Sequence, residues 1–243
     1  MISKNQIKHI RQLEMKKYRQ REGLFVAEGP KVVGDLLTAG FTPKEIYAVE
    51  NYQGAIQNIQ TVTQDELCKI SFLQHPQQVL AVFPIRTIPS SLPLLNGQLT
   101  LALDGVQDPG NLGTIIRIAD WFGISTIFCS EDTADAWNPK VVQATMGSIA
   151  RVNIIYTSLE EIIRNATVPV YGTLLDGDDI YQQQLSQEGI IVMGNEGNGI
   201  STTIRQMITR KLLIPSFRQG DTAESLNVAI ATAITFSEFR RRK

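Results

Sequence analysis

Short apolar runs alternate with helix-length segments over residues 98–243. The apolar runs are nearly continuous, which is typical of strands that are covered on both faces of a sheet. Six of them predict strands: LTLALDG (99–105), STIFCS (125–130), RVNIIYT (151–157), VPVYGTLL (168–175), GIIVMGN (189–195) and KLLIP (211–215). Helices are predicted between several of these strands, over residues 112–122, 139–147, 158–166 and 200–209. This alternation favours an α/β fold built on a parallel sheet.

Residues 1–88 predict a smaller mixed α/β domain. It starts with a basic helix and continues with an apolar run at 23–29, a helix near 31–39 and strand candidates at 45–50 and 77–83. The following segment, FPIRTIPSSLPLLNG (83–97), holds three prolines, which disfavour both helices and strand ladders. We therefore predict an N-terminal domain at 1–88, a linker at 89–97 and a second domain at 98–243.

The last predicted helix runs from Ser225 to about Arg241 and is apolar on nearly all sides. A helix without a polar face must be buried over most of its surface. Small residues in this segment also allow another backbone to approach closely. We expect the helix to pack against the sheet and to form a subunit interface.

Composition indicates a folded intracellular protein. Hydrophobic residues make up 43% of the chain and charged residues 19%, so a buried core is expected and disorder is not. No apolar run approaches the roughly 18 residues that a membrane span needs, and the N-terminus lacks a signal-peptide core. Two cysteines, Cys68 and Cys129, form neither a disulfide framework nor a metal-type spacing. We expect a cytoplasmic location, without membrane or metal.

Basic residues gather at the two ends of the chain. The net charge is −1, but seven of the 23 Lys and Arg lie within residues 1–22 and four more form the terminal RRRK at 240–243. Clustered Lys and Arg can neutralise phosphates and release counterions. The alternative for the N-terminal run is a solvated helix face opposite a buried stripe of Ile7, Ile10 and Leu13.

Three loops rich in Gly, Asn and polar groups follow predicted strands: DGVQDPGNLG (104–113), GNEGNGIS (194–201) and PSFRQGDTAESLN (215–227). Ligands bind at the carboxyl ends of strands in open parallel sheets, although such residues also simply make turns. The spacing of GNEGNG is not that of a dinucleotide loop, and both histidines, His9 and His75, precede the linker. A site here must use Arg, Glu, Ser, Asn and backbone groups, which favours group transfer from an activated cofactor.

These loops belong to three stretches that resemble a known family: DPGNLGTIIRIADWFG (108–123), IIVMGNEGNGIS (190–201) and IPSFRQGDTAESLNVAIATAI (214–234). In this order and spacing they resemble the motifs of the SpoU (TrmH) family of RNA ribose 2′-O-methyltransferases, in the SPOUT superfamily. Residues 138–152 and 4–29 are also similar to the catalytic and substrate-binding domains of that family. The resemblance covers essentially the whole chain.

The resemblance implies S-adenosylmethionine as methyl donor, a homodimer and a C-terminal trefoil knot. The hydrophobic pattern alone predicts an ordinary doubly wound sheet, because threaded chains are rare. The N-terminal domain is expected to resemble ribosomal-protein-like RNA-binding domains. The expected substrate is the ribose 2′-hydroxyl of rRNA or tRNA, with rRNA favoured by the presence of this separate domain.

Site residues follow from the resemblance, position by position. It implies five catalytic residues: Asn111, Arg117, Glu196, Ser225 and Asn227. It implies four donor-binding residues that act largely through backbone groups: Thr173, Gly194, Ile214 and Leu226. The loop at 216–227 is a few residues longer than the usual third-motif loop.

Arg117 is unusual because its segment, 112–122, is apolar apart from this arginine and Asp120. We expect Arg117 to position an RNA phosphate and to stabilise the developing alkoxide, while Ser225, Asn227 or a phosphate oxygen relays the proton. The alternatives are a surface pair with Asp120, a helix N-terminal role for Glu196 and N-capping of the last helix by Ser225 or Asn227. Two other functions remain open: a non-enzymatic RNA-binding protein and a methyltransferase that acts on a base.

Overall fold

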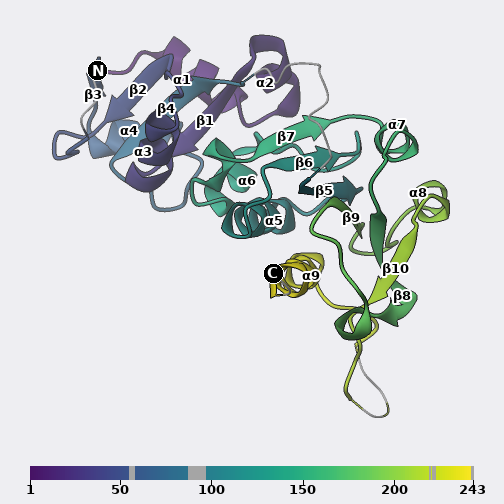
Figure 1. Cartoon of the computed structure of the whole chain (residues 1–243). Coiled ribbons are helices and arrows are strands. Elements are labelled where there is room, and N and C mark those ends of the chain that lie inside the picture. Colours follow the sequence, from purple (N-terminus) through teal and green to yellow (C-terminus); the bar gives the residue numbers. More distant parts are fainter. Residues whose placement is uncertain (55–57, 87–96, 219, 221–222, 242–243) are drawn as a thin grey trace. The chain divides into compact units, whose positions relative to one another are not determined.

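The computed structural model describes residues 1–54, 58–86, 97–218, 220 and 223–241 (Figure 1). The chain forms two compact units: Met1–Thr87 with Asp135–Arg151, and Ile88–Ala134 with Val152–Lys243. Segment Asp135–Arg151, which lies within the predicted second domain, is thus grouped with the first unit. The predicted linker at 89–97 lies outside the described residues apart from Gly97, so the predicted domain boundaries stay a prediction.

The first unit is a four-stranded sheet with helices. Its elements are α1 (Lys4–Gln12), α2 (Lys16–Glu22), β1 (Leu24–Glu28), α3 (Pro30–Thr38), β2 (Glu45–Ala48), β3 (Gln60–Thr61), α4 (Gln64–Ile70), β4 (Val79–Pro84), α6 (Pro139–Ala144) and the 3-10 turn η1 (Ser148–Ala150). The strand order is β1-β4-β2-β3, with β4 antiparallel to both neighbours. The sequence did not predict β3 or α4. β3 has two residues, and α4 depends on a local capping box between Thr63 and Glu66.

The single basic helix predicted at the N-terminus is two helices. The chain turns at Met15, whose backbone is extended (φ −95°, ψ 129°), and Leu13 is fully buried. Arg19 stabilises this turn by donating from Nη1 to the carbonyls of Leu13 and Glu14, at 2.7 Å each. Its Nε and Nη2 donate to Asp135 Oδ2 at 2.9 and 2.5 Å. Because Arg19 is only 1% exposed, it is not part of a basic surface.

All five positions of β1 are buried, because elements from distant parts of the chain cover this strand. Phe25 stacks on Phe83 of β4 at 5.7 Å between ring centroids and contacts Trp137 at 4.6 Å. Trp137 precedes α6, which packs against β1. Ile10 and Leu13 lie in the same unit's core with Val26 and Leu80, as the predicted apolar stripe of the first helix requires.

The second unit contains the predicted parallel sheet. Its elements are β5 (Leu99–Asp104), α5 (Pro109–Trp121), β6 (Thr126–Cys129), β7 (Asn153–Tyr156), α7 (Leu159–Arg164), β8 (Val170–Asp179), η2 (Ile180–Gln182), β9 (Gly189–Gly194), α8 (Thr202–Gln206), β10 (Arg210–Leu213) and α9 (Val228–Arg241). The strand order is β10-β8-β9-β5-β6-β7, and all neighbours are parallel. The six predicted strands and the α/β class are confirmed.

Parallel pairing sets where the polar loops lie. All neighbouring strands are parallel, so the carboxyl ends of β5, β9 and β10 lie at one edge of the sheet, and three polar loops begin at that edge. These are the three loops that the sequence singled out. Among the described residues, no helix is both long and apolar enough to span a membrane.

The last helix differs from its prediction at its start. α9 begins at Val228 rather than Ser225, because Asn227 Oδ1 accepts the N–H groups of Ala229 (2.9 Å) and Ile230 (3.3 Å) and so caps the helix. One face of α9 is buried, and the helix packs against α5 and β9. Ile230 on the other face is 53% exposed. Within one chain the helix is therefore covered on one side only.

Candidate active site

Glu196 joins the loop after β9 to the loop after β5. Its Oε1 accepts the N–H of Asp108 at 3.1 Å and the side-chain amide of Asn111 at 3.0 Å. Its Oε2 accepts the N–H of Gln107 at 3.1 Å. The carboxylate thus holds the start of α5 against the second-motif loop.

The pKa of Glu196 lies below the ordinary value of a glutamate. Burial raises this pKa, but the hydrogen bonds from Asn111 and from the main-chain N–H groups of Gln107 and Asp108 together lower it by more. Glu196 is therefore a carboxylate near neutral pH and acts as an acceptor. The cap of α5 itself is Asp108, whose side chain accepts the N–H of Asn111 at 2.7 Å.

Asn111 extends this network to the third motif. Its Oδ1 accepts a hydrogen bond of 2.9 Å from Nδ2 of Asn227, while its Nδ2 donates to Glu196. These hydrogen bonds fix which side-chain atom is the nitrogen and which the oxygen in both Asn111 and Asn227. Asn227 uses its nitrogen for Asn111 and its oxygen to cap α9. One residue from each of the three predicted motifs therefore lies in a continuous chain of hydrogen bonds.

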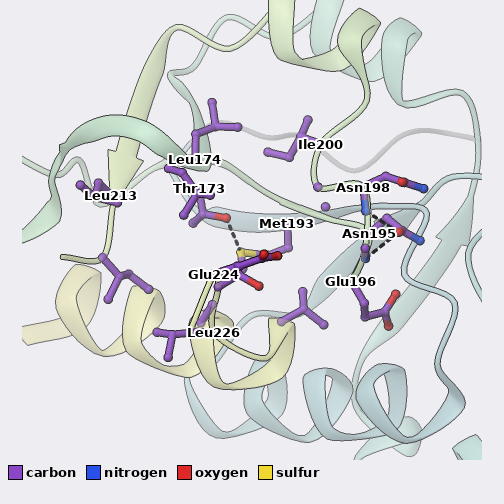
Figure 2. A pocket seen from close by; sticks show the side chains of 18 of the residues that line it. Thr173, Leu174, Met193, Asn195, Glu196, Asn198, Ile200, Leu213, Glu224 and Leu226 are labelled. Carbon is purple, nitrogen blue, oxygen red and sulfur yellow. Dashed lines mark hydrogen bonds between the residues drawn. The ribbon is translucent and has the colours of Figure 1, made fainter. Parts of the chain in front are cut away.

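A cavity of about 360 Å³ lies beside this network, between the middle of β8, the ends of β9 and β10 and the start of α9 (Figure 2). All four residues predicted to bind the donor line it: Thr173, Gly194, Ile214 and Leu226. Glu196 and Ser225 line it as well. Six of the nine predicted site residues thus surround one cavity, and Asn111 and Asn227 connect to it through Glu196.

Gly194 also has a structural reason to be glycine. A Cβ at this position would lie 2.2 Å from the carbonyl carbon of Gly199 and 2.3 Å from the nitrogen of Ile200. The chain passes this close because Asn195 and Gly199 form a bridge that closes the second-motif turn. Asn195, which the sequence did not single out, shapes the turn by accepting the N–H groups of Gly197 and Asn198 at 2.9 Å. An asparagine directly after a strand is a recognisable signal for such a turn.

Arg117 is not among the residues that line the cavity. It is exposed on α5, six residues after Asn111, which places it roughly 120° around the helix from Asn111. It makes no hydrogen bond or ion pair within the part of the chain that the structure describes, so the pairing with Asp120 is not observed there. Ser225 is exposed and does not cap α9. Glu224, its neighbour, lines the cavity and was missed by the sequence reasoning.

Family models match both parts of the chain. Residues 98–237 match the SpoU rRNA Methylase family, and residues 4–81 match the MRM3-like substrate binding domain. The chain belongs to the SpoU rRNA methylase family. The resemblance inferred from the three motifs is confirmed.

Several full-length proteins are similar to this member of the SpoU family. The 23S rRNA (guanosine(2553)-2′-O)-methyltransferase RlmP of Bacillus subtilis is 32% identical over 249 residues, covering 98% of this chain and 97% of the relative. The structure of a putative RNA methyltransferase of the TrmH family from Porphyromonas gingivalis is 41% identical, with a TM-score of 0.88 and full coverage of both chains. An AdoMet-bound rRNA methyltransferase from Sinorhizobium meliloti is 34% identical, with a TM-score of 0.87 over 100% of this chain and 97% of the other.

Proposed function

We propose that this SpoU family member transfers a methyl group from S-adenosylmethionine to a ribose 2′-hydroxyl of ribosomal RNA. The observation that carries the proposal is the hydrogen-bonded chain Glu196–Asn111–Asn227 beside the cavity. It joins one residue of each motif at the edge of the sheet where ligands bind in parallel folds. The rRNA methyltransferases among the relatives support ribosomal RNA over transfer RNA.

The cavity fits a nucleoside-like donor. Its volume of about 360 Å³ lies within the range of small-molecule pockets. Leu174, Leu213 and Ile200 provide apolar walls. Among the described residues, the main-chain N–H groups of Ile214 and Leu226 make no hydrogen bond, so they remain available to the polar edge of a base. Thr173 would line the same wall through its main chain, because its hydroxyl donates to the sulfur of Met193 at 3.4 Å.

Each side chain then has a separate task. When bound, S-adenosylmethionine supplies an electrophilic methyl group on a sulfonium. Glu196 holds Asn111 and the start of α5 in place, and Asn111 in turn orients Asn227. Ser225 is an exposed residue that lines the cavity, where its hydroxyl would relay the proton that leaves the ribose.

Arg117 is assigned to positioning rather than to proton abstraction. Guanidinium groups stay protonated in proteins, and their planar fork matches a phosphate bidentately. The exposed Arg117 has no partner among the described residues, so RNA phosphate is a suitable counter-charge. Arg117→Lys keeps the charge but can lose a proton at high pH. Near-wild-type turnover of this variant at raised pH would show that the positioning role is wrong.

The proposal includes a homodimer. α9 packs against α5, and both helices carry exposed apolar side chains, with Trp121 85% and Ile230 53% exposed. Large exposed apolar groups on neighbouring helices are typical of interaction surfaces. Arg117 lies on α5 and does not line the cavity of its own chain. In a dimer formed through these helices, Arg117 could instead approach the cavity of the second copy.

The trefoil knot and the location of the protein are proposed on the family resemblance. Close backbone approaches at Gly194 and at Gly177, where a Cβ would lie 2.6 Å from the carbonyl carbon of Leu212, support a tightly threaded C-terminal part. The proposed cytoplasmic location is consistent with the bacterial 23S rRNA methyltransferases among the relatives. The predicted absence of a metal requirement is kept as a proposal that a chelator test can address.

The first unit is proposed to bind RNA. Six of the seven basic residues in 1–22 are exposed: Lys4, Lys8, Arg11, Lys16, Lys17 and Arg21. Such a cluster attracts the phosphate backbone without reading its sequence. The match to a substrate-binding domain over residues 4–81 supports this assignment.

A methylation assay tests the function directly. Purified protein is incubated with labelled S-adenosylmethionine and with ribosomal or transfer RNA, and the products are mapped by alkaline hydrolysis. We expect one linkage in ribosomal RNA to become alkali-resistant, because a 2′-O-methyl group blocks cleavage there. Label without alkali resistance would indicate base methylation. RNA binding with neither donor binding nor label incorporation would indicate a non-enzymatic RNA-binding protein.

A further inference from the structure

Among the described residues, two carboxylates line the cavity, Glu196 and Glu224, and their surroundings differ. Glu196 accepts hydrogen bonds from two main-chain N–H groups and from the Asn111 amide. Glu224, in the segment just before α9, makes no hydrogen bond or ion pair with any other described residue. In Figure 2, the labelled side chains of Glu224 and Glu196 lie apart from each other.

Within the described part of the cavity wall, no cationic side chain pairs with Glu224. Among the described lining residues, Arg205 has the only cationic side chain, and it forms an ion pair with Asp176 at 2.5 Å. Leucine and isoleucine side chains make up much of the remaining wall. Glu224 itself is exposed, so solvent screens its charge and its attraction for a ligand cation is of the size of a surface pair. The cavity therefore favours a ligand that brings its own positive charge.

We propose that Glu224 makes the cavity select the cationic methyl donor against the neutral product of the transfer. This inference rests on the proposed function. In the reaction the ribose oxygen bonds to the methyl carbon, the sulfur–carbon bond breaks with its electron pair left on sulfur, and the hydroxyl proton is released. The sulfonium of S-adenosylmethionine thereby becomes the neutral thioether of S-adenosylhomocysteine. The ammonium and carboxylate groups are common to both molecules, so attraction between the sulfonium and Glu224 distinguishes them.

Selection of this kind affects turnover. The attraction holds the donor before transfer and disappears when the charge on sulfur is lost. Product release is then favoured by the same residue that favours donor binding. Glu224 acts through charge alone and takes no part in proton transfer, so it is a specificity-determining residue distinct from Ser225 and Asn227.

Isothermal titration of the protein of residues 1–243 with each ligand tests the inference. Glu224→Gln keeps the shape of the side chain and removes its charge. We expect its dissociation constant for S-adenosylmethionine to rise about fivefold, as a partly exposed charge pair provides, and that for S-adenosylhomocysteine to change by less than about twofold. The difference between the ligands should shrink when ionic strength is raised from about 0.05 to about 0.5 M.

Glu160→Gln is the matched control, because it removes the same charge from α7 at a residue that does not line the cavity. It should leave both dissociation constants unchanged. Equal weakening of both ligands by Glu224→Gln would mean that the carboxylate binds a group they share, which overturns the inference. Unchanged affinity for both ligands would overturn it as well. A wild-type protein that binds neither ligand would instead overturn the proposed function on which the inference rests.

Discussion

The buried ion pair between Arg19 and Asp135 gives the sharpest prediction about stability. Asp135→Asn keeps the size of the side chain and keeps Oδ1, which accepts the main-chain N–H of Trp137. It removes the negative charge that faces Arg19. Arg19 is 1% exposed, so its guanidinium cannot turn to water. Breaking a buried pair in this way costs about 3–5 kcal/mol, because one charge is left buried without its partner.

A double variant separates the pair from the other contacts of Arg19. Replacing a buried pair by apolar residues is often neutral. In Arg19→Met/Asp135→Leu, however, the carbonyls of Leu13 and Glu14 lose their donor at the turn between α1 and α2, and the main-chain N–H of Trp137 loses its Asp135 acceptor. An unsatisfied buried acceptor costs about 1–3 kcal/mol, so we expect a residual loss of about 2 kcal/mol relative to wild type.

Urea unfolding followed by tryptophan fluorescence measures both effects. Trp121 and Trp137 are the two tryptophans, and Trp137 lies against Phe25 in the first unit. A Trp121→Phe background makes Trp137 the reporter of that unit. Lys31→Ala, which breaks the exposed pair with Asp35, is the control and should cost less than about 1 kcal/mol. A loss below 1 kcal/mol for Asp135→Asn, or full recovery in the double variant, would refute the reasoning.

Three further predictions concern the site and the surfaces. Asn111→Ala should lower the rate of single-turnover methylation roughly 100-fold, because the three motifs would no longer be held in place relative to one another. Its affinity for the donor, measured by titration, should stay within about twofold of the wild-type value, because Asn111 does not line the cavity. Because folding lowers the pKa of Glu196, the ionised carboxylate stabilises the fold at pH values above the ordinary glutamate pKa, and this stabilisation is lost as the pH falls through the lower pKa of the folded state. The difference in unfolding free energy between wild type and Glu196→Gln should therefore shrink below about pH 4. Lys8→Ala and Lys16→Ala should each reduce the salt-dependence slope of RNA binding by about one in a filter assay, and an unchanged slope would remove these residues from the RNA surface.

The hydrophobic pattern predicted the second unit well because its strands are long enough to be recognised one by one. β5 and β9 are buried at nearly every position, and such runs are read without knowledge of their partners. The pattern could not show that segment Asp135–Arg151 joins the first unit. Trp137 and α6 read as an ordinary helix between two strands, and only the tertiary contact of Trp137 with Phe25 reveals which core they enter.

Local signals also failed where a charge has a long-range partner. Arg19 looks like one more member of a basic run, since seven Lys and Arg lie in the first 22 residues. Its burial depends on Asp135, which is 116 residues away, and on a turn at Met15 that no glycine or proline marks. A count of basic residues in the sequence therefore overestimates the basic surface, because it includes residues such as Arg19 that are buried in the fold.

Asn227 shows why the third motif needed the structure. The sequence placed Asn227 inside the last predicted helix with a catalytic role, and capping of that helix by Ser225 or Asn227 was the alternative. In the structure Asn227 is itself the cap, and the same side chain donates to Asn111. The two roles support each other, because capping fixes the oxygen of the amide and so directs its nitrogen toward Asn111. A substitution such as Asn227→Asp would keep the cap but replace the donor by a second acceptor, so the helix should persist while the link between the first and third motifs is lost.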